Sequence, residues 1–288
     1  MATEGGHASE YDPLLTPKLR AEAVRVIRGF SFAGGHVVVV GGLVPSLLVP
    51  NPEAGVERHI GTQDLDLCLS VALVEGNVGN YDRLEKSLKD AGFQMAREGG
   101  QSISWRWRGG ADLPLTVEFF CAAGPGRTPG RLHRPGGVVG GKLSALVLSA
   151  GRLIDADTRE VEVEVDLPAG GGRTRQPVKV VGPAAYLASK ADALRRRDKN
   201  KDAYDIVWLA ESWPGGQEQL AREIRGTSIA GDVDFLEALR VLDQEFLSID
   251  SAGAVKYARF MAEDATSHDR LARQAVGAVA TVLRALRA

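Results

Sequence analysis

Two aspartates, two positions apart, are the residues of this 288-residue chain best placed to do chemistry. Asp64 and Asp66 belong to the run DLDLCLS, Asp64 to Ser70, in which polar or small residues alternate with leucines, and this alternation predicts a strand. Alternate residues of a strand share a face, so the two carboxylates lie on one side, roughly 6 to 7 Å apart by the strand rise. Their repulsion raises a pKa unless a cation lies between them, and Mg²⁺ suits carboxylates combined with phosphate oxygens. A hydrated edge strand is the alternative without a metal.

A glycine pair favours the metal interpretation. Gly41 and Gly42 directly follow the β-branched run HVVVV, His36 to Val40, and precede the apolar segment Leu43 to Val49, for which we expect a helix. Glycines let a phosphate approach the backbone closely, and the first amides of the next helix point toward an anion. A phosphate site beside a metal site is therefore predicted, although a plain turn at the end of a strand also explains the pair.

A third carboxylate is a further candidate ligand. Glu118 stands between Val117 and Phe119 in the apolar run LTVEFF, and a carboxylate in that setting lies either at an exposed edge or at a metal. The competing acids belong to a later predicted strand, and they are Glu162, Glu164 and Asp166.

A charged segment in the second half of the chain contains aspartates and basic residues at helical spacing. On a helix, Asp202 and Asp205 share the spacing of the apolar Ile206 and Leu209, so both aspartates face inward and need partners. Lys190 and Arg197 occupy one stripe of the preceding predicted helix. Both cations are available to these aspartates or to the phosphates of a nucleotide, and an ion-pair network that clamps two helices is the structural alternative.

Together these motifs resemble a known family. Gly41-Gly42, Asp64-Leu65-Asp66 and Glu118 resemble the glycine, DxD and third-carboxylate pattern of the DNA polymerase β nucleotidyltransferase superfamily. KADALRRRDKNKDAYDIVWL, from Lys190 to Leu209, resembles the lysine–aspartate segment of the AbiEii-type nucleotidyltransferases, the toxins of type IV toxin–antitoxin pairs. The resemblance covers roughly Val37 to Leu209.

The resemblance implies an enzyme that transfers a nucleoside monophosphate from an NTP to an acceptor hydroxyl. It implies that Asp64 and Asp66 hold Mg²⁺ or Mn²⁺, and that Glu118 helps with a second ion. It further implies that Lys190 neutralises phosphate charge and that Asp202 orients or deprotonates the acceptor. The residues expected to contact the NTP are Gly41, Gly42, Ser46 and Arg197.

The acceptor is open between several classes. In toxins that this chain resembles it is often the 3′ end of tRNA, and a protein side chain or an aminoglycoside is the alternative. A non-catalytic module that binds RNA or protein is a further alternative, and a cognate antitoxin is an implied partner. Local charge favours RNA, and the basic residues near the predicted site are Arg195, Arg196, Arg197, Lys199, Lys201, Arg106, Arg108, Arg127, Arg131 and Arg134. Trp105 and Trp107 either stack on bases or pack in the core.

The elements that position these residues predict an α/β fold. We expect a polymerase-β-like mixed sheet flanked by helices over residues 1–182 and a helical domain over 183–288 that contributes Lys190 and Asp202 to the site. Helical periodicity covers Pro17 to Phe30 and Tyr81 to Ala91. The further strands are expected at Ser102 to Arg108, Leu115 to Phe120, Glu160 to Asp166 and Pro177 to Val181. Six helices are expected to begin near Ala184, Lys201, Gln217, Val233, Gly253 and His268.

Composition excludes some classes of protein. A net charge of −2 predicts no overall attraction to nucleic acid or membrane, so any polyanion site must be a local patch. The start of the chain has no signal-peptide pattern, and the apolar run Val37 to Val49 is too short to span a bilayer. Cys68 and Cys121 lie in apolar runs typical of buried free thiols, which favours the cytoplasm. The five histidines have no metal-ligand spacing, so we expect solvated or structural roles for them.

Overall fold

The structure is a computed structural model of the 288-residue chain. It describes residues 6–288 with the exception of 31–35, 71–78, 112–113, 135–142 and 265.

Two compact units make up the described chain. The sheet unit contains Leu14–Leu47 and Thr62–Val181. The helical unit contains Leu48–Gly61, Gly182–Ala288 and the start of the chain up to Pro13. We describe each unit by itself.

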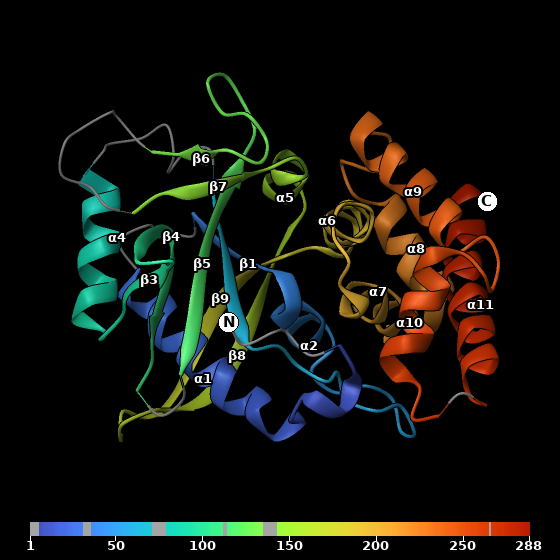
Figure 1. The fold of residues 1–288 in the computed structure, drawn as a ribbon, viewed down its shortest axis with the longest axis horizontal. Helices are drawn as coiled ribbons and strands as arrows, with labels where there is room; N and C mark the ends of the chain where they lie inside the picture. Colours follow the sequence, from blue (N-terminus) through green and yellow to red (C-terminus); the bar gives the residue numbers. More distant parts are fainter. Residues whose placement is uncertain (1–5, 31–35, 71–78, 112–113, 135–142, 265) are drawn as a thin grey trace. The chain divides into compact units, whose positions relative to one another are not determined.

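The sheet unit is built on a mixed sheet that has nine strands within the described residues (Figure 1). The strand order is β3-β4-β5-β2-β1-β9-β8, with β7 paired to β5 and β6 paired to β7. Strand β2 lies inside the sheet, parallel to β5 and antiparallel to β1. The strands are β1 Val37–Val40, β2 Asp64–Leu69, β3 Gln94–Glu98, β4 Gln101–Gly109, β5 Leu115–Ala122, β6 Leu132–His133, β7 Ala145–Leu148, β8 Thr158–Leu167 and β9 Gly172–Val181.

One face of this sheet is apolar and covered by a helix. The leucines of β2 and the alternate residues Val117 and Phe119 of β5 are fully buried there. Phe30, which ends the helix α1 (Thr16–Gly29), contacts Phe119 with 6.1 Å between ring centroids. Each buried leucine or phenylalanine stabilises the fold by about 1.5 to 3 kcal/mol. Because residues alternate along a strand, this packing leaves the aspartates of β2 on the other face.

Short helices complete the sheet unit. Two of them directly follow β1, so the glycine pair forms the turn between a buried strand and a helix. Within the described residues, the helices of this unit besides α1 are η2 Pro13–Leu15, η4 Gly41–Leu43, α2 Val44–Leu48, α4 Gly79–Asp90 and α5 Gly151–Ala156.

The helical unit consists of six α-helices, shown from amber to red in Figure 1, and a short 3₁₀ helix, within the described residues. Helix α6 begins with Pro183 after Gly182, which suits proline because the first helical N–H has no partner inside the helix. Helix α7 lies against α6, α8, α10 and α11, so nearly all of its residues are buried. The helices are η1 Ala8–Glu10, α6 Pro183–Arg196, α7 Asn200–Ser212, α8 Gly216–Arg225, α9 Val233–Glu245, α10 Ala252–Met261 and α11 His268–Arg287.

The division into two units does not follow the single boundary near residue 182 that the sequence predicts. The helical unit resumes at Gly182, where we predicted the boundary, but it also includes residues 48–61 from the first half. This segment belongs there because Trp208 Nε1 of α7 donates to the carbonyl of Glu57 at 3.0 Å and Tyr204 Oη accepts from the Ile60 N–H at 3.0 Å.

The secondary structure agrees with the sequence pattern where periodicity is strong. All six C-terminal helices begin within one residue of the predicted positions. Four described elements between residues 92 and 157 were not predicted: β3, β6, β7 and α5. Strand β3 is the polar run QMARE at an edge of the sheet, so it lacks the apolar alternation that marks a half-buried strand.

The cysteines are free and buried, as predicted. Cys68 lies on the face of the sheet that carries Asp66, whereas Cys121 lies on the face that carries Leu69, so the two thiols point away from each other. Among the helices that the structure describes, none combines the length and apolarity needed to cross a membrane.

Candidate functional site

The carboxylates of β2 lie on one face of the sheet, as their spacing predicts. The burial of Leu65 and Leu67 on the opposite face fixes this orientation. Strand β5 runs parallel beside β2 and pairs Thr116 with Asp64 and Glu118 with Asp66. Polar side chains of two adjacent strands therefore share one face.

Gly41, which directly follows β1, lies beside Asp66 on this face. Its φ is +70°, a backbone conformation that residues with a Cβ rarely adopt. A Cβ atom on Gly41 would overlap the Asp66 carboxylate and would lie 2.7 Å from its Cγ. The fold thus brings Gly41 of the predicted pair against Asp66 of the predicted aspartates, and only glycine fits at position 41.

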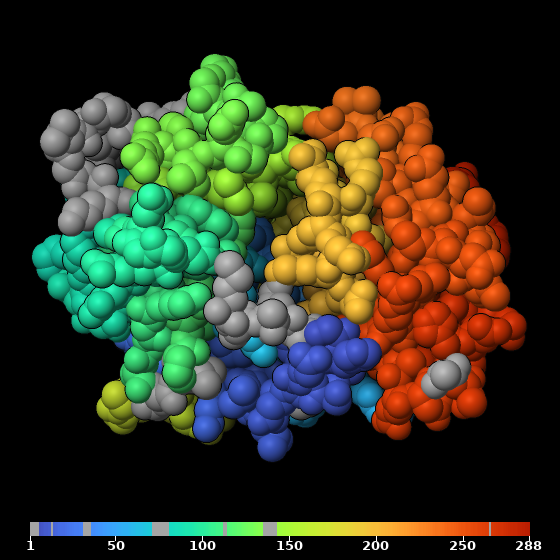
Figure 2. Space-filling view, in the orientation of Figure 1, coloured from blue at the N-terminus to red at the C-terminus, as the bar shows by residue number. Residues whose placement is uncertain are grey.

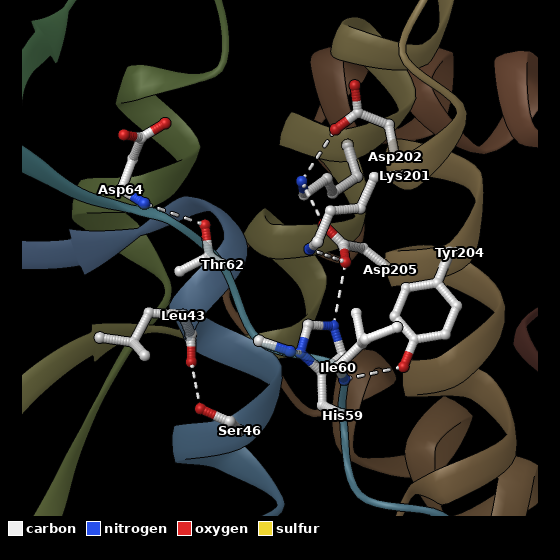
Figure 3. Close-up of polar contacts among 12 residues, drawn as sticks. Leu43, Ser46, His59, Ile60, Thr62, Asp64, Lys201, Asp202, Tyr204 and Asp205 are labelled. Carbon is white, nitrogen blue, oxygen red and sulfur yellow. Dashed lines mark hydrogen bonds and ion pairs between the residues drawn. The ribbon is translucent and has the colours of Figure 1, made fainter. Parts of the chain in front are cut away.

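The electrostatics of Asp64 favour a cation. Burial raises the pKa of Asp64 above its ordinary value. A hydrogen bond with Thr116 and the positive charges of Arg106 and Arg108 oppose this rise without cancelling it. The backbone N–H of Asp64 is 3.4 Å from Thr62 Oγ1 (Figure 3). The ionised form of Asp64 is therefore less stable here than in water, and a bound cation would reverse that effect.

Glu118 is engaged by an arginine. Arg106 Nε lies 2.6 Å from Glu118 Oε1, and Arg106 Nη1 lies 3.3 Å from Glu98 Oε1. Within the described residues no group of three or more histidine, cysteine, aspartate or glutamate side chains is arranged to hold a metal ion. Asp64 and Asp66 consequently remain the main candidate ligands, with Glu118 beside them but ion-paired.

The competing acids of β8 are distant from β2. Strands β9 and β1 lie between them in the sheet, a separation of roughly 14 Å by the strand spacing. Glu162 and Glu164 instead pair with arginines of the neighbouring strand, Arg175 at 3.4 Å and Arg173 at 2.5 Å. Of the glutamates weighed in the sequence, Glu118 is the one that stands next to Asp66.

Ser46 is placed differently from the expectation. Its side chain is buried, and its hydroxyl donates a hydrogen bond to the carbonyl of Leu43 at 2.9 Å within the first turns after β1 (Figure 3). Its own carbonyl accepts a hydrogen bond from Arg20. The hydroxyl thus serves the local helix geometry, and this arrangement gives no support to a contact between Ser46 and an NTP.

The helical unit holds the second set of predicted residues in a buried cluster. Lys190 Nζ on α6 lies 2.8 Å from Asp202 Oδ1 and 2.6 Å from Asp205 Oδ2, both on α7. Lys201 Nζ lies 2.6 Å from Asp205 Oδ1 (Figure 3). The side chains are almost inaccessible, at 8% exposure for Lys190 and 1% for Asp205. The cluster therefore clamps α6 to α7.

Arg197 forms the exposed edge of this cluster. Its Nε and Nη2 bind both oxygens of Asp202, at 2.7 and 2.8 Å, while 47% of its side chain is exposed. Lys256 of α10 donates to the carbonyls of Leu194 and Arg197 at 3.2 and 3.0 Å, which holds the corner where α6 ends. Arg197 is thus positioned to meet an anion from solvent.

The ionisable groups of the cluster stabilise each other in their charged forms. Burial alone would lower the pKa of Lys190, but Asp202 and Asp205 reverse this and raise it. Burial alone would raise the pKa of Asp202, but Lys190 and Arg197 hold it at about 2. A carboxylate with so low a pKa is a weak base at neutral pH, which argues against Asp202 as the group that deprotonates an acceptor.

His59 is the member of the cluster that sequence reasoning missed. It is buried, and its Nε2 donates to Asp205 Oδ1 at 2.9 Å (Figure 3). Its Nδ1 accepts a hydrogen bond from the Gly61 N–H at 3.1 Å. The signal in the sequence was the need of an inward Asp205 for partners, but no pattern points to a histidine 146 positions away.

Several basic and aromatic residues considered for RNA binding have structural partners instead. Lys201 is buried against Asp205, and Arg127 is buried with its Nε donating to the carbonyl of Ala122 at 3.0 Å. Trp107 is fully buried with its Nε1 on the carbonyl of Ser104, so it packs in the core. Arg195, in contrast, is exposed near the end of α6. In Figure 2 the amber part of the chain forms part of the visible surface.

A protein-family model supplies the identification. The model described as the nucleotidyl transferase AbiEii toxin of a type IV toxin–antitoxin system matches residues 62–278, well over half of the 288-residue chain. This chain belongs to the AbiEii family. The matched residues of this AbiEii protein include the carboxylates of β2 and the whole segment from Lys190 to Asp205. The glycine pair and His59 precede the matched range.

The other comparisons add little. The crystal structure of JHP933 from Helicobacter pylori shares 13% sequence identity with this AbiEii protein, over 93% of each chain. The TM-score is 0.38, too low for that likeness to say anything of the fold. No curated protein matches the chain.

Proposed function

We propose that this AbiEii-family protein transfers a nucleoside monophosphate from an NTP to an acceptor hydroxyl. The acceptor oxygen would form a bond to the α-phosphorus while the bond to pyrophosphate breaks, and pyrophosphate would leave. One observation carries the proposal. Because Gly41 has no Cβ, the Asp66 carboxylate can lie against the turn that follows β1. Asp64 is on the same face of the sheet as Asp66. The family is one of nucleotidyl transferase toxins.

The residues on this face fit a hard divalent cation. Asp64 and Asp66 offer carboxylate oxygens, and Asp64 has a raised pKa that a cation would lower again. Bound Mg²⁺ or Mn²⁺ would neutralise phosphate charge and align the attacking and leaving oxygens. Glu118 would join only by sharing its carboxylate with Arg106. Gly41 and Gly42 would allow the triphosphate to approach the backbone.

The cluster of the helical unit would supply positive charge for the phosphates. Its three cations, Lys190, Arg197 and Lys201, exceed its two carboxylates by one charge. Arg197 has the exposure needed to contact a phosphate. Lys190, which is buried, would add positive charge without direct contact. Asp202 would orient both cations rather than act as a base.

The proposed acceptor is the 3′ end of tRNA, within the cytoplasm. The support is the pair Arg195 and Arg196, exposed at the end of α6 close to Arg197 in the chain. The type IV toxin–antitoxin family also makes a cognate antitoxin the proposed protein partner.

A label-transfer assay tests the reaction. The protein is incubated with each α-³²P-labelled NTP, Mg²⁺ or Mn²⁺, and either total tRNA or total protein. We expect label on tRNA, and no label with Asp66→Ala, because loss of a metal ligand removes at least about 4 kcal/mol of transition-state stabilisation. Asp82→Ala, an exposed aspartate on α4, is the matched control and should keep full activity. Absence of label under every condition with the wild-type protein would refute the transferase proposal.

Charge reversal tests the acceptor. Arg195→Glu combined with Arg196→Glu should raise the KM for tRNA and flatten its salt dependence, because each lost phosphate contact removes a counterion-release contribution. Arg240→Glu combined with Arg273→Glu makes the same charge change at exposed helical positions elsewhere and should leave tRNA kinetics unchanged. Equal kinetics for both double variants would point to a protein or small-molecule acceptor.

A further inference from the structure

The segment from Glu57 to Gly61, here called the strap, is fixed to one face of helix α7. Trp208 Nε1 donates to the carbonyl of Glu57. Tyr204 Oη accepts from the Ile60 N–H, and His59 Nε2 donates to Asp205 (Figure 3). The three α7 residues at positions 204, 205 and 208 have the spacing of one helix face. An irregular segment held at three successive points has little freedom to move.

The ring of His59 is locked at the centre of the strap. It lies against Tyr204 and Trp208, with 5.2 and 4.9 Å between ring centroids, and its side chain is fully inaccessible. Because Nδ1 accepts the Gly61 N–H, the single proton of the neutral ring must sit on Nε2 and point at Asp205. Tyr204 and Trp208 of α7 therefore fix the orientation of the ring, and the Gly61 N–H of the strap fixes its tautomer.

Asp205 has to serve both lysines of the cluster. His59 and Lys201 bind Oδ1, at 2.9 and 2.6 Å, while Lys190 lies 2.6 Å from Oδ2. Rotation of the Asp205 carboxylate would break at least one of these contacts. The lysines that hold the Asp205 carboxylate belong to α6 and α7. His59, which belongs to neither helix, fixes the rotation of this carboxylate through its Nε2–H.

We propose that His59 is a positioning residue for nucleotidyl transfer: its Nε2–H fixes the Asp205 carboxylate, which in turn holds the Lys190 ammonium in place. The inference rests on the proposed function for its catalytic consequence, whereas the positioning itself is a property of the cluster. Asp64 follows His59 by only five positions, so the strap also leads directly into the strand that carries the proposed metal ligands.

The electrostatics around His59 support a neutral donor. The charged groups that face it are Asp205 and Lys201 of α7 and Lys190 of α6. Burial lowers the pKa of His59 to about 4, and the two lysines add to that effect, while Asp205 opposes it. The ring consequently keeps one proton through the neutral range, as a fixed donor rather than a pH switch.

Three substitutions separate positioning from packing. His59→Gln keeps an N–H that reaches Asp205, His59→Asn keeps only an acceptor near Gly61, and His59→Phe keeps the ring volume without a donor. The first readout needs no activity: ¹H–¹⁵N spectra of lysine ammonium groups, which resolve buried ion-paired lysines. We expect the Lys190 and Lys201 signals in the wild type and in His59→Gln, and their loss or displacement in His59→Asn and His59→Phe.

The second readout is kinetic. We expect kcat for transfer to fall at least about tenfold in His59→Phe and His59→Asn and to recover to within about threefold in His59→Gln, since small displacements of a catalytic group cost rate steeply. Unchanged lysine signals in every folded variant would overturn the proposal and leave His59 a packing residue. Displaced lysine signals without measurable transfer in any protein, wild type included, would uphold the positioning and reject the proposed function.

Discussion

Asp64 of the sheet unit and Asp205 of the helical unit have pKa values shifted in opposite directions. Asp64 has its pKa raised by burial, whereas Asp205 has its pKa held well below the ordinary value, although burial alone would raise it, because Lys190 and Lys201 lie against it. Asp64 lacks enough compensating positive charge to offset its burial, whereas Asp205 has it in full. A cation bound beside Asp64 would therefore stabilise its ionised form, whereas Asp205 already has two lysines against it.

The same difference separates two kinds of function. Carboxylates with raised pKa values gain stability when a metal binds, so their role depends on a ligand. A buried network whose charges are mutually satisfied gains nothing from a metal, and it holds side chains in fixed positions. This contrast agrees with the proposed roles, in which β2 binds a metal and the junction of α6 and α7 positions side chains.

Breaking the helical network should have the largest effect on stability. Asp205→Ala leaves Lys201 without its carboxylate and Lys190 with only Asp202, and breaking a buried ion pair costs about 3 to 5 kcal/mol. Urea denaturation followed by circular dichroism measures this loss. Asp192→Ala, which removes the half-exposed partner of Arg196, is the matched control and should cost less than about 1 kcal/mol. Equal costs would mean that solvent already screens the buried cluster.

Filling the space beside Asp66 should have an intermediate effect. Gly41→Ala adds a Cβ that overlaps the Asp66 carboxylate, and the alanine must adopt the positive φ of Gly41. We expect a loss of about 2 kcal/mol in the free energy of unfolding. We also expect Mn²⁺ binding, measured by titration calorimetry, to weaken at least about tenfold. Gly92→Ala also has a positive φ, but its Cβ meets nothing within 4 Å. This control should lose stability without losing Mn²⁺ affinity, and weakened Mn²⁺ binding in both variants would contradict the contact argument.

Neutralising Asp64 should have the smallest effect, with an opposite sign. The folded state holds the Asp64 proton more tightly than the unfolded state does, so the contribution of this group to stability falls as pH rises from its unfolded pKa of about 4 to its higher folded pKa. Asp64→Asn removes that penalty and should stabilise the metal-free protein by about 0.5 kcal/mol at pH 7. The gain should vanish below about pH 4, where both states are protonated. A loss of stability at pH 7 would show that the ionised form is already compensated without metal.

Much of the fold could be predicted from local patterns. Period-two alternation in β2 placed both aspartates on one face, and helical periodicity located the six C-terminal helices almost to the residue. Inward spacing of Asp202 and Asp205 on α7 correctly predicted that they need partners, and Lys190 and Arg197 are among those partners. These features follow from neighbours in the sequence, which share a helix face or strand face whatever the rest of the chain does.

Tertiary structure alone decided the contacts between distant segments. The overlap that forbids a Cβ at Gly41, the pairing of Arg106 with Glu118, and the donation from His59 to Asp205 each join different elements of the chain. The burial of Ser46 and Lys201 is of the same kind, because both residue types are commonly exposed. Sequence periodicity specifies which face of an element is apolar, but hydrogen bonds and ion pairs depend on distances of about 3 Å, which are set only when those faces pack.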